Sequence, residues 1–188
     1  MKFKGLKKVH QGKFITRYNL DYETEKGNLK TYEMISRNPD IKSFDELRSS
    51  RVDAVVLVLH DESGERLLLN REFRMATGEW IYNFPAGLID EGEDARRAAR
   101  RELFEETGLN LVKIEDVWGE SYSAIGFSNE KNFVVEGCAA GEIRPSDSDM
   151  EEIEAKWYTK SEIRAILKNP ESRFAARTQA YCVLWSRS

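Results

Sequence analysis

The chain of 188 residues is long enough for one domain with a small appendage and a full hydrophobic core. Its formal net charge of -4 argues against a general nucleic-acid-binding protein, and no run of about 18 apolar residues is present to span a membrane. The basic first residues lack the apolar stretch of a signal peptide, so we expect a cytoplasmic protein whose two cysteines, Cys138 and Cys182, are reduced and buried.

The first 37 residues are predicted to form antiparallel strands. In KFITRYNLDYET, alternate residues from Phe14 to Tyr22 fall on one face, as the period of two in a strand requires. The turn EKGN then leads into a return strand, LKTYEMISR. Pro39 and a cluster of turn-forming residues interrupt this pattern, which predicts a boundary between an N-terminal unit, residues 1–45, and a main domain, residues 46–188.

The main domain alternates segments typical of strands and of helices. Strands are predicted at 51–61, 66–74 and 80–87, followed by a helix at 94–107 that Gly108 ends as a C-terminal cap. Three further strands are predicted at 113–123, 132–141 and 153–159, and two helices at 160–169 and 171–187, the last with Phe174, Thr178, Tyr181 and Trp185 along one face. This order predicts an α/β or α+β protein with helices packed on a mixed sheet.

The helix at 94–107 carries the clearest chemical signal, because Glu102, Glu105 and Glu106 crowd its C-terminal end. Residues three and four apart are neighbours on a helix, so these carboxylates adjoin. Carboxylates held so close are stable only if protonated, solvated or bridged by a cation, and oxygen ligands favour a hard divalent ion such as magnesium. The alternative is a surface acidic patch paired with the arginines of the same helix, Arg96, Arg97, Arg100 and Arg101.

The surrounding spacing favours the metal site. Residues 87–109 match the pattern G-x5-E-x7-R-E-U-x-E-E-x-G-U at every position, where U is an apolar residue. Outside the glutamate cluster, the polar and glycine positions are Gly87, Glu93, Arg101 and Gly108. With this motif the sequence resembles the Nudix hydrolases, which implies an α/β/α sandwich with a mixed sheet, preceded here by an N-terminal antiparallel β-hairpin extension.

The resemblance also implies a cofactor and roles for residues. It implies magnesium, with manganese as a possible substitute, bound by Glu102 and Glu106 with help from Glu105 and the backbone carbonyl of Ala86. It further implies a salt bridge between Glu93 and Arg101 that fixes the loop before the helix. Arg74 is a candidate cation for a diphosphate, the alternative being an exposed arginine at a strand end.

Three segments resemble the pyrophosphatases of ADP-ribose and nucleoside diphosphate sugars in particular: the hairpin ending YEMISR, the strand REFR and the segment SAIGFSNE. In that group the N-terminal strands commonly cross to a second subunit, which implies a homodimer with Arg37, Gly126 and Glu130 facing the substrate. The group usually has Ser-Pro-Gly where this chain has Ala124-Ile125-Gly126, a departure that weakens ADP-ribose but not nucleotide sugars in general.

The acidic loop at 147–152 lies where the same group places a further base or metal ligand. By analogy, Glu151 is expected to bind metal and Asp149 to activate water, with Glu152 a rival for either role. The alternative is a loop that is merely solvated.

We therefore expect magnesium-dependent hydrolysis of the diphosphate bond of ADP-ribose or a related nucleoside diphosphate sugar, giving a nucleoside monophosphate and a sugar phosphate. The alternatives are hydrolysis of another nucleotide, such as GDP-mannose, a dinucleoside polyphosphate or an oxidised nucleoside triphosphate, and a non-catalytic nucleotide-sensing module. A sensor would be expected to lose its metal glutamates, and here all three are present. The expected partners are a small-molecule nucleotide and a second copy of the chain, with no nucleic acid and no membrane.

Overall fold

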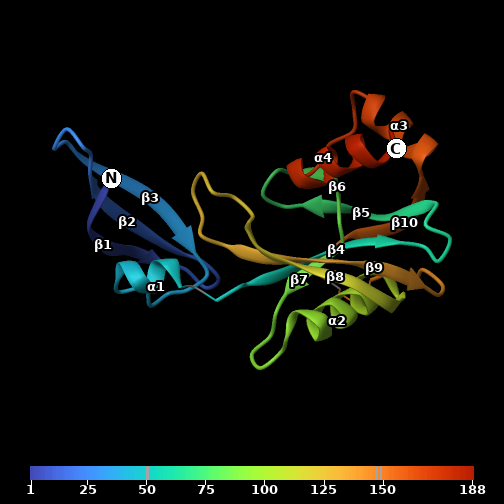
Figure 1. Ribbon diagram of the computed structural model, residues 1–188, viewed down its shortest axis with the longest axis horizontal. Coiled ribbons are helices and arrows are strands. Elements are labelled where there is room, and N and C mark those ends of the chain that lie inside the picture. Colours follow the sequence, from blue (N-terminus) through green and yellow to red (C-terminus); the bar gives the residue numbers. More distant parts are fainter. Residues whose placement is uncertain (50, 147, 149) are drawn as a thin grey trace. The chain divides into compact units, whose positions relative to one another are not determined.

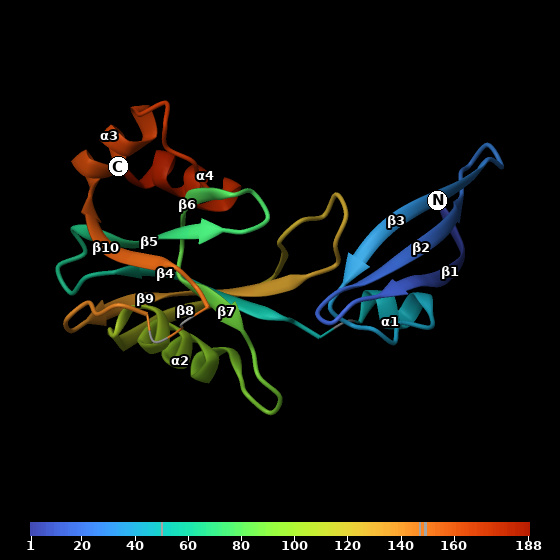
Figure 2. The same cartoon turned by 180° about the vertical axis from the view of Figure 1, so that it is seen from behind.

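A computed structural model of the chain describes every residue except Ser50, Asp147 and Asp149 (Figure 1, and Figure 2 from behind). The described residues form two compact units. Unit 1 comprises Met1–Asp53 and Glu120–Asn132, and unit 2 comprises Ala54–Gly119 and Phe133–Ser188. The sequence predicted a division after residue 45 and did not anticipate the second segment of unit 1.

Unit 1 is built on an antiparallel sheet in the order β1–β2–β3. Its elements are β1 (Lys2–Gln11), β2 (Thr16–Glu23), β3 (Leu29–Ser36) and the short helix α1 (Phe44–Arg48). A hairpin was predicted, and the structure adds β1 to it as a third strand. Tyr18, Leu20, Met34 and Ile41 form the buried core of the unit.

Phe14 does not lie on the strand face that the sequence predicted for it. Gln11 pairs with Thr16, so the residues between them form the connecting turn, closed by a hydrogen bond from the Gly12 amide to the Ile15 carbonyl. The side chain of Phe14 is consequently 70% exposed.

Unit 2 contains the larger sheet, in which the central order is β10-β5-β4-β9-β8, with β6 paired to β5 and β7 paired to β4. The strands are β4 (Ala54–His60), β5 (Arg66–Arg74), β6 (Glu79–Asn83), β7 (Ala86–Leu88), β8 (Asn110–Tyr122), β9 (Lys131–Ala140) and β10 (Ile153–Thr159). The strand predicted at 80–87 is thus two short strands separated by Phe84 and Pro85. The outer ends of β8 and β9 belong to unit 1.

Helices cover both faces of this sheet (Figure 1). Helix α2 (Ala95–Thr107) packs on one face, and α3 (Lys160–Lys168) and α4 (Ala176–Trp185) lie on the other. This confirms the predicted α/β/α sandwich and explains why β4 and β5 are buried almost continuously.

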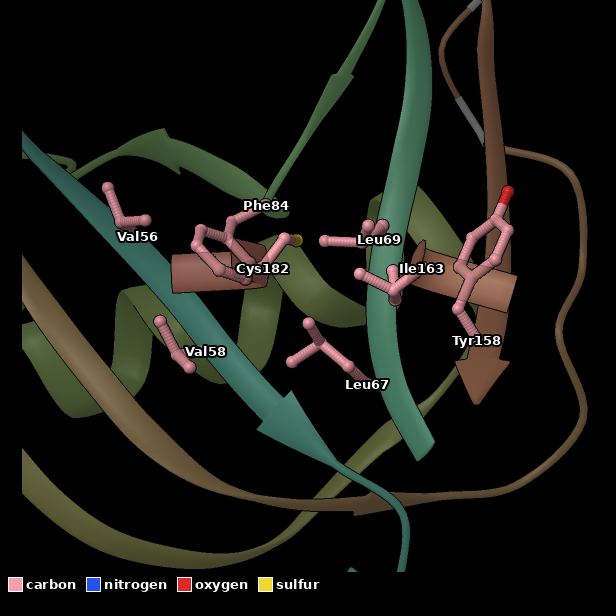
Figure 3. Close-up of a cluster of buried hydrophobic side chains, with 8 residues drawn as sticks. All are labelled: Val56, Val58, Leu67, Leu69, Phe84, Tyr158, Ile163 and Cys182. Carbon is pink, nitrogen blue, oxygen red and sulfur yellow. The ribbon is translucent and has the colours of Figure 1, made fainter. Parts of the chain in front are cut away.

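The core under α3 and α4 is shown in Figure 3: it consists of Val56, Val58, Leu67, Leu69, Phe84, Tyr158, Ile163 and Cys182. Burial raises the pKa of the Cys182 thiol to about 12, so this cysteine behaves as an apolar side chain. Cys138, predicted to be buried, is only partly buried. In the described part of the chain, no helix has both the length and the apolar character needed to cross a lipid bilayer.

Helix α4 begins later than the predicted range of 171–187. The Tyr82 amide donates to the Arg173 carbonyl at 2.8 Å, and the Ala175 amide donates to the Tyr82 carbonyl at 3.0 Å. These bonds hold residues 173–175 extended alongside β6, so Phe174 packs on Tyr82 instead of lying on the helix. Thr178, Tyr181 and Trp185 do belong to α4.

Helix α2 ends where the sequence predicted. The Asp94 side chain caps its N-terminus by accepting hydrogen bonds from the amides of Arg96 and Arg97, both at 2.9 Å. Gly108 caps its C-terminus with φ +74°, and its amide donates to the Phe104 carbonyl at 2.8 Å. The left-handed backbone at this position favours glycine.

We expect Gly108→Ala to lower the free energy of unfolding by at least about 1 kcal/mol, because a side chain makes the left-handed conformation unfavourable. The new Cβ would also lie 2.8 Å from Nε of Arg144. Gly119→Ala is the matched control, since a Cβ there meets no atom within 4 Å. Urea unfolding of both variants measures the difference, and equal stability would contradict the role of the cap.

Candidate active site

The loop before α2 is joined to that helix by the guanidinium of Arg101. Its Nη2 donates to the Leu88 carbonyl and to Oε2 of Glu93, both at 2.8 Å, and its Nε donates to Oε1 of Glu93 at 3.2 Å. The expected salt bridge between Glu93 and Arg101 is therefore present. These hydrogen bonds lower the pKa of Glu93 and raise that of Arg101, so both stay charged.

Glu102 lies against the backbone of Gly87. An ideal Cβ at residue 87 would be 1.9 Å from the carboxyl carbon of Glu102, so any side chain there would displace this carboxylate. Arg101 Nη1 donates to Oε1 of Glu102 at 2.8 Å. Burial nevertheless raises the pKa of Glu102, because the loss of solvent outweighs this hydrogen bond.

Glu106 is the most buried acid of the helix, with 7% of its surface exposed. Its Oε2 accepts a hydrogen bond from Nδ2 of Asn70 on β5 at 2.8 Å. Burial raises the pKa of Glu106 well above its ordinary value, and the negative charges of Glu102 and Glu72 raise it further. The site therefore contains a buried carboxyl group with more negative than positive neighbours.

Glu105 lies differently from the other two glutamates. Its side chain is 51% exposed, and it accepts a hydrogen bond from Nη1 of Arg101 at 3.2 Å. Glu102 and Glu106 are one helical turn apart and share the inward face, whereas Glu105 points to solvent. The three predicted neighbours thus separate into an inner pair and an outer residue.

Sequence reasoning missed Glu72, a fourth carboxylate at this site. It is 8% exposed, and it accepts hydrogen bonds from Asn83 Nδ2 at 2.8 Å and Arg74 Nη1 at 3.4 Å. The period of two in β5 could have identified it, because Leu68, Asn70 and Glu72 fall on one face of the strand. Arg74, predicted to lie at the strand end, is the last residue of β5.

The acidic loop also reaches β5, since the Phe73 amide donates to the Glu152 carbonyl at 3.0 Å. Glu151 is exposed, and its negative charge raises the pKa of both Glu102 and Glu106. Glu151 is therefore within electrostatic reach of the inner pair. Asp149, the candidate for activating water, lies outside the described residues.

The donor set fits a hard divalent cation. Glu102 and Glu106 offer carboxylate oxygens on one face of α2, and Oδ1 of Asn70 is buried without a hydrogen-bond partner. Ala86, the other expected ligand, is partly buried in β7 and pairs with Val56. Among the described residues, no three His, Cys, Asp or Glu side chains form a ready-made metal-binding group. A cation would nevertheless offset the repulsion within this set.

The residues expected to face the substrate are brought together in unit 1. Arg37 Nε donates to Glu130 Oε2 at 2.6 Å, and the Tyr32 hydroxyl donates to the Gly126 carbonyl. The unit also contains a pocket of about 510 Å³. Aromatic and cationic side chains line much of it: Tyr22, Tyr32, Phe44, Tyr122, Lys30 and Arg48.

The sandwich fold and the carboxylate site define the class of protein. Residues 50–178 match the sequence profile of the NUDIX domain, and the chain belongs to the Nudix family. Nudix hydrolases generally use divalent metal cations.

Individual relatives agree with this family. The mouse ADP-sugar pyrophosphatase is 30% identical over 142 residues, covering 73% of this chain and 62% of the mouse protein. Nudix hydrolase 19, chloroplastic, of Arabidopsis thaliana is 32% identical over 132 residues, covering 69% and 30%. The Escherichia coli ADP compounds hydrolase NudE is 29% identical over 127 residues, covering 68% and 61%. The chain thus spans less than two thirds of each of these relatives.

A crystal structure of an ADP compounds hydrolase shares the fold. It superposes with a TM-score of 0.73 and 22% identity, covering 100% of this chain and 93% of the other.

We expect Glu93→Gln to destabilise the protein by about 1 kcal/mol at pH 7, because it removes charge-assisted hydrogen bonds that are partly exposed. The pKa of Glu93 is lowered on folding from an ordinary value of 4.5. Its contribution is therefore present above that value and is lost as the pH falls through the folded pKa. Urea unfolding at pH 7 and near pH 3 should show the difference from wild type shrink toward zero.

Glu91→Gln, an exposed substitution in the same loop, is the control and should change little at either pH. A destabilisation by Glu93→Gln that is equal at both pH values would contradict the ionic origin of the effect.

Proposed function

We propose that this chain is a Nudix pyrophosphatase that hydrolyses the diphosphate bond of ADP-ribose or a related nucleoside diphosphate sugar. The products are a nucleoside monophosphate and a sugar phosphate, and the cofactor is magnesium, with manganese able to replace it. The observation that carries the proposal is the inner pair, in which Glu102 lies against Gly87 and buried Glu106 is subject to the charges of Glu102 and Glu72. The mouse ADP-sugar pyrophosphatase and the Escherichia coli ADP compounds hydrolase, both similar to this chain, support the substrate class.

In unit 2, one group of residues would bind the cofactor and another the diphosphate. Glu102, Glu106, the Ala86 carbonyl and Glu151 would hold the cation. When bound, the cation neutralises the diphosphate and makes water more acidic. Arg74, whose side chain is 57% exposed, presents N–H donors to a phosphate oxygen.

A proton from the attacking water needs an acceptor that is both ionised and accessible. Asp149 of the acidic loop is our candidate acceptor, and Glu105, an exposed acid on α2 beside the inner pair, is the alternative. Glu106 is less suited to exchanging protons with solvent, because it is buried. Its burial suits a ligand whose position must not change.

Unit 1 would bind the rest of the substrate. The Arg37–Glu130 pair offers both a donor and an acceptor to a base or a sugar. The aromatic lining of the unit 1 pocket is suited to stacking on a flat ring. A nucleoside triphosphate has no second sugar and would gain less binding energy from side chains that bind one.

We expect ADP-ribose and other nucleoside diphosphate sugars to have higher kcat/KM than nucleoside triphosphates. The panel should contain ADP-ribose, GDP-mannose, UDP-glucose, diadenosine polyphosphates and 8-oxo-dGTP, each with magnesium and with manganese. Release of nucleoside monophosphate is the readout. A clear preference for 8-oxo-dGTP would contradict the substrate class but not the family.

Glu106→Gln tests the site in the same assay. Loss of a charged metal ligand should lower the rate on the best substrate by about a thousandfold while the fold is kept. The matched control is Glu115→Gln on the exposed part of β8, which should keep the wild-type rate. Parent-like activity of Glu106→Gln would show that this cluster is not the catalytic site.

The proposal includes a homodimer in which residues 1–37 contact the catalytic domain of a second copy. Unit 1 has a small core and exposes several large apolar side chains: Met1, Phe14, Ile15, Leu29, Ile125 and Phe127. Such surfaces are typical of protein interfaces.

Light scattering at micromolar concentration should give twice the 21.7 kDa mass of one chain. Leu29→Asp should shift the equilibrium toward monomer, whereas Leu184→Asp, a similarly exposed leucine in unit 2, should not. A wild-type monomer would contradict the dimer and the role of Arg37 that depends on it.

A further inference from the structure

Glu72 is buried on the face of β5 that meets α2, two residues before the end of the strand. Asn70 and Glu72 are 1% and 8% exposed, and Asn70 binds Glu106 directly. Arg74 follows two residues later, so it continues the same face of the strand. The buried carboxylate of Glu72 therefore lies between the metal-binding helix and the exposed arginine.

One oxygen of Glu72 is fixed from the interior of unit 2. Asn83 Nδ2 donates to its Oε1 at 2.8 Å, and Thr178 Oγ1 donates to Oδ1 of Asn83 at 3.0 Å. Thr178 is fully buried in α4. A chain of two hydrogen bonds thus anchors the carboxylate to the helix on the opposite face of the sheet.

The other oxygen is directed at the guanidinium of Arg74. Nη1 of Arg74 donates to Oε2 of Glu72 at 3.4 Å, and the arginine side chain is 57% exposed. A guanidinium has five N–H donors, so one bond to Glu72 leaves the others for an anion. The pairing limits the conformations of a long side chain without occupying its binding capacity.

A buried negative charge beside a diphosphate site opposes anion binding, so its presence there calls for a structural reason. We propose that Glu72 is a positioning residue: its anchored carboxylate holds Arg74 at the edge of the cluster on α2, where the guanidinium binds the substrate diphosphate. This inference rests on the proposed function. Because the pairing orders Arg74 before the nucleotide arrives, it lowers the entropy lost on binding.

Glu72→Gln tests the inference selectively. A glutamine can still accept the hydrogen bond from Asn83, but its amide nitrogen would face Arg74 and cannot accept from it. The affinity for ADP with magnesium, measured by calorimetry, should fall about tenfold, as expected for loss of one charge-assisted contact. KM for the best nucleotide of the panel should rise by a similar factor, with kcat within about twofold.

A double-mutant cycle shows whether Glu72 acts through Arg74. Arg74→Ala should weaken ADP binding at least as much as Glu72→Gln, and the double variant should be no weaker than Arg74→Ala alone. Additive losses would overturn the inference. Should Glu72→Gln fail to fold, Glu72→Asp, which keeps the charge but shortens the side chain, replaces it in the same cycle with the same expected pattern.

The matched control is Glu154→Gln. Glu154 on β10 pairs with Arg71 of β5 at 3.0 Å, which is also a carboxylate–arginine pair of this strand but on its other face. Its loss should leave ADP affinity and KM unchanged. An equal loss of ADP affinity in this control would overturn the inference, because breaking any ion pair of β5 would then be enough to weaken ADP binding.

Manganese affinity, measured by electron paramagnetic resonance, separates positioning from ligation. It should stay within about twofold of wild type in Glu72→Gln, because on this inference neither Glu72 nor Arg74 is a ligand of the cation. Weakened manganese binding with unchanged ADP affinity would overturn the inference in favour of Glu72 as a metal ligand. A wild-type chain that binds no ADP would refute the proposed function itself, whereas equal ADP affinity in wild type and Glu72→Gln would refute only this inference.

Discussion

The guanidinium of Arg101 is the interaction on which the rest of the site depends. It donates to Glu93 and the Leu88 carbonyl in the loop before α2, and to Glu102 and Glu105 on α2 itself. It therefore fixes the loop and two of the helix's acids. Without this cation, these carboxylates would repel one another and the loop would lose its attachment to the helix. An arginine is suited to this role because its planar group can donate to several acceptors in fixed directions.

Electrostatic strain remains where Arg101 does not reach. Glu106 has no cationic hydrogen-bond partner among the described residues, and Asn70 alone donates to it. The scaffold compensates with well-formed local structure: α2 is capped at both ends, and Ala98, Ala99 and Leu103 are fully buried on its inner face. Stability of this kind permits a few unfavourable charges to be kept where a cation is to bind.

The parts of the structure that depend on local sequence could be predicted. The period of α2, its glycine cap and the motif from Gly87 to Leu109 identify a helix with inward carboxylates, because these signals act over a few residues. The start of α4 could not be predicted, since Arg173 and Ala175 are held extended by bonds to a strand about 90 residues earlier. The period of β5 could have placed Glu72 on the same face as Asn70, but its bond to Asn83, which Thr178 holds in turn, forms only in the folded chain.

The segment Glu120–Asn132 has a consequence for how this protein can be rearranged. Unit 1 uses it as an additional edge: the Ile35 amide donates to the Phe127 carbonyl at 2.8 Å, and the Lys131 amide donates to Asp53 at 3.0 Å. The N-terminal unit is therefore not a contiguous cassette. A chimera that exchanged only residues 1–53 would pair the sheet of one protein with the 120–132 segment of the other. Substrate specificity could therefore be transferred only by exchanging both segments of unit 1 together.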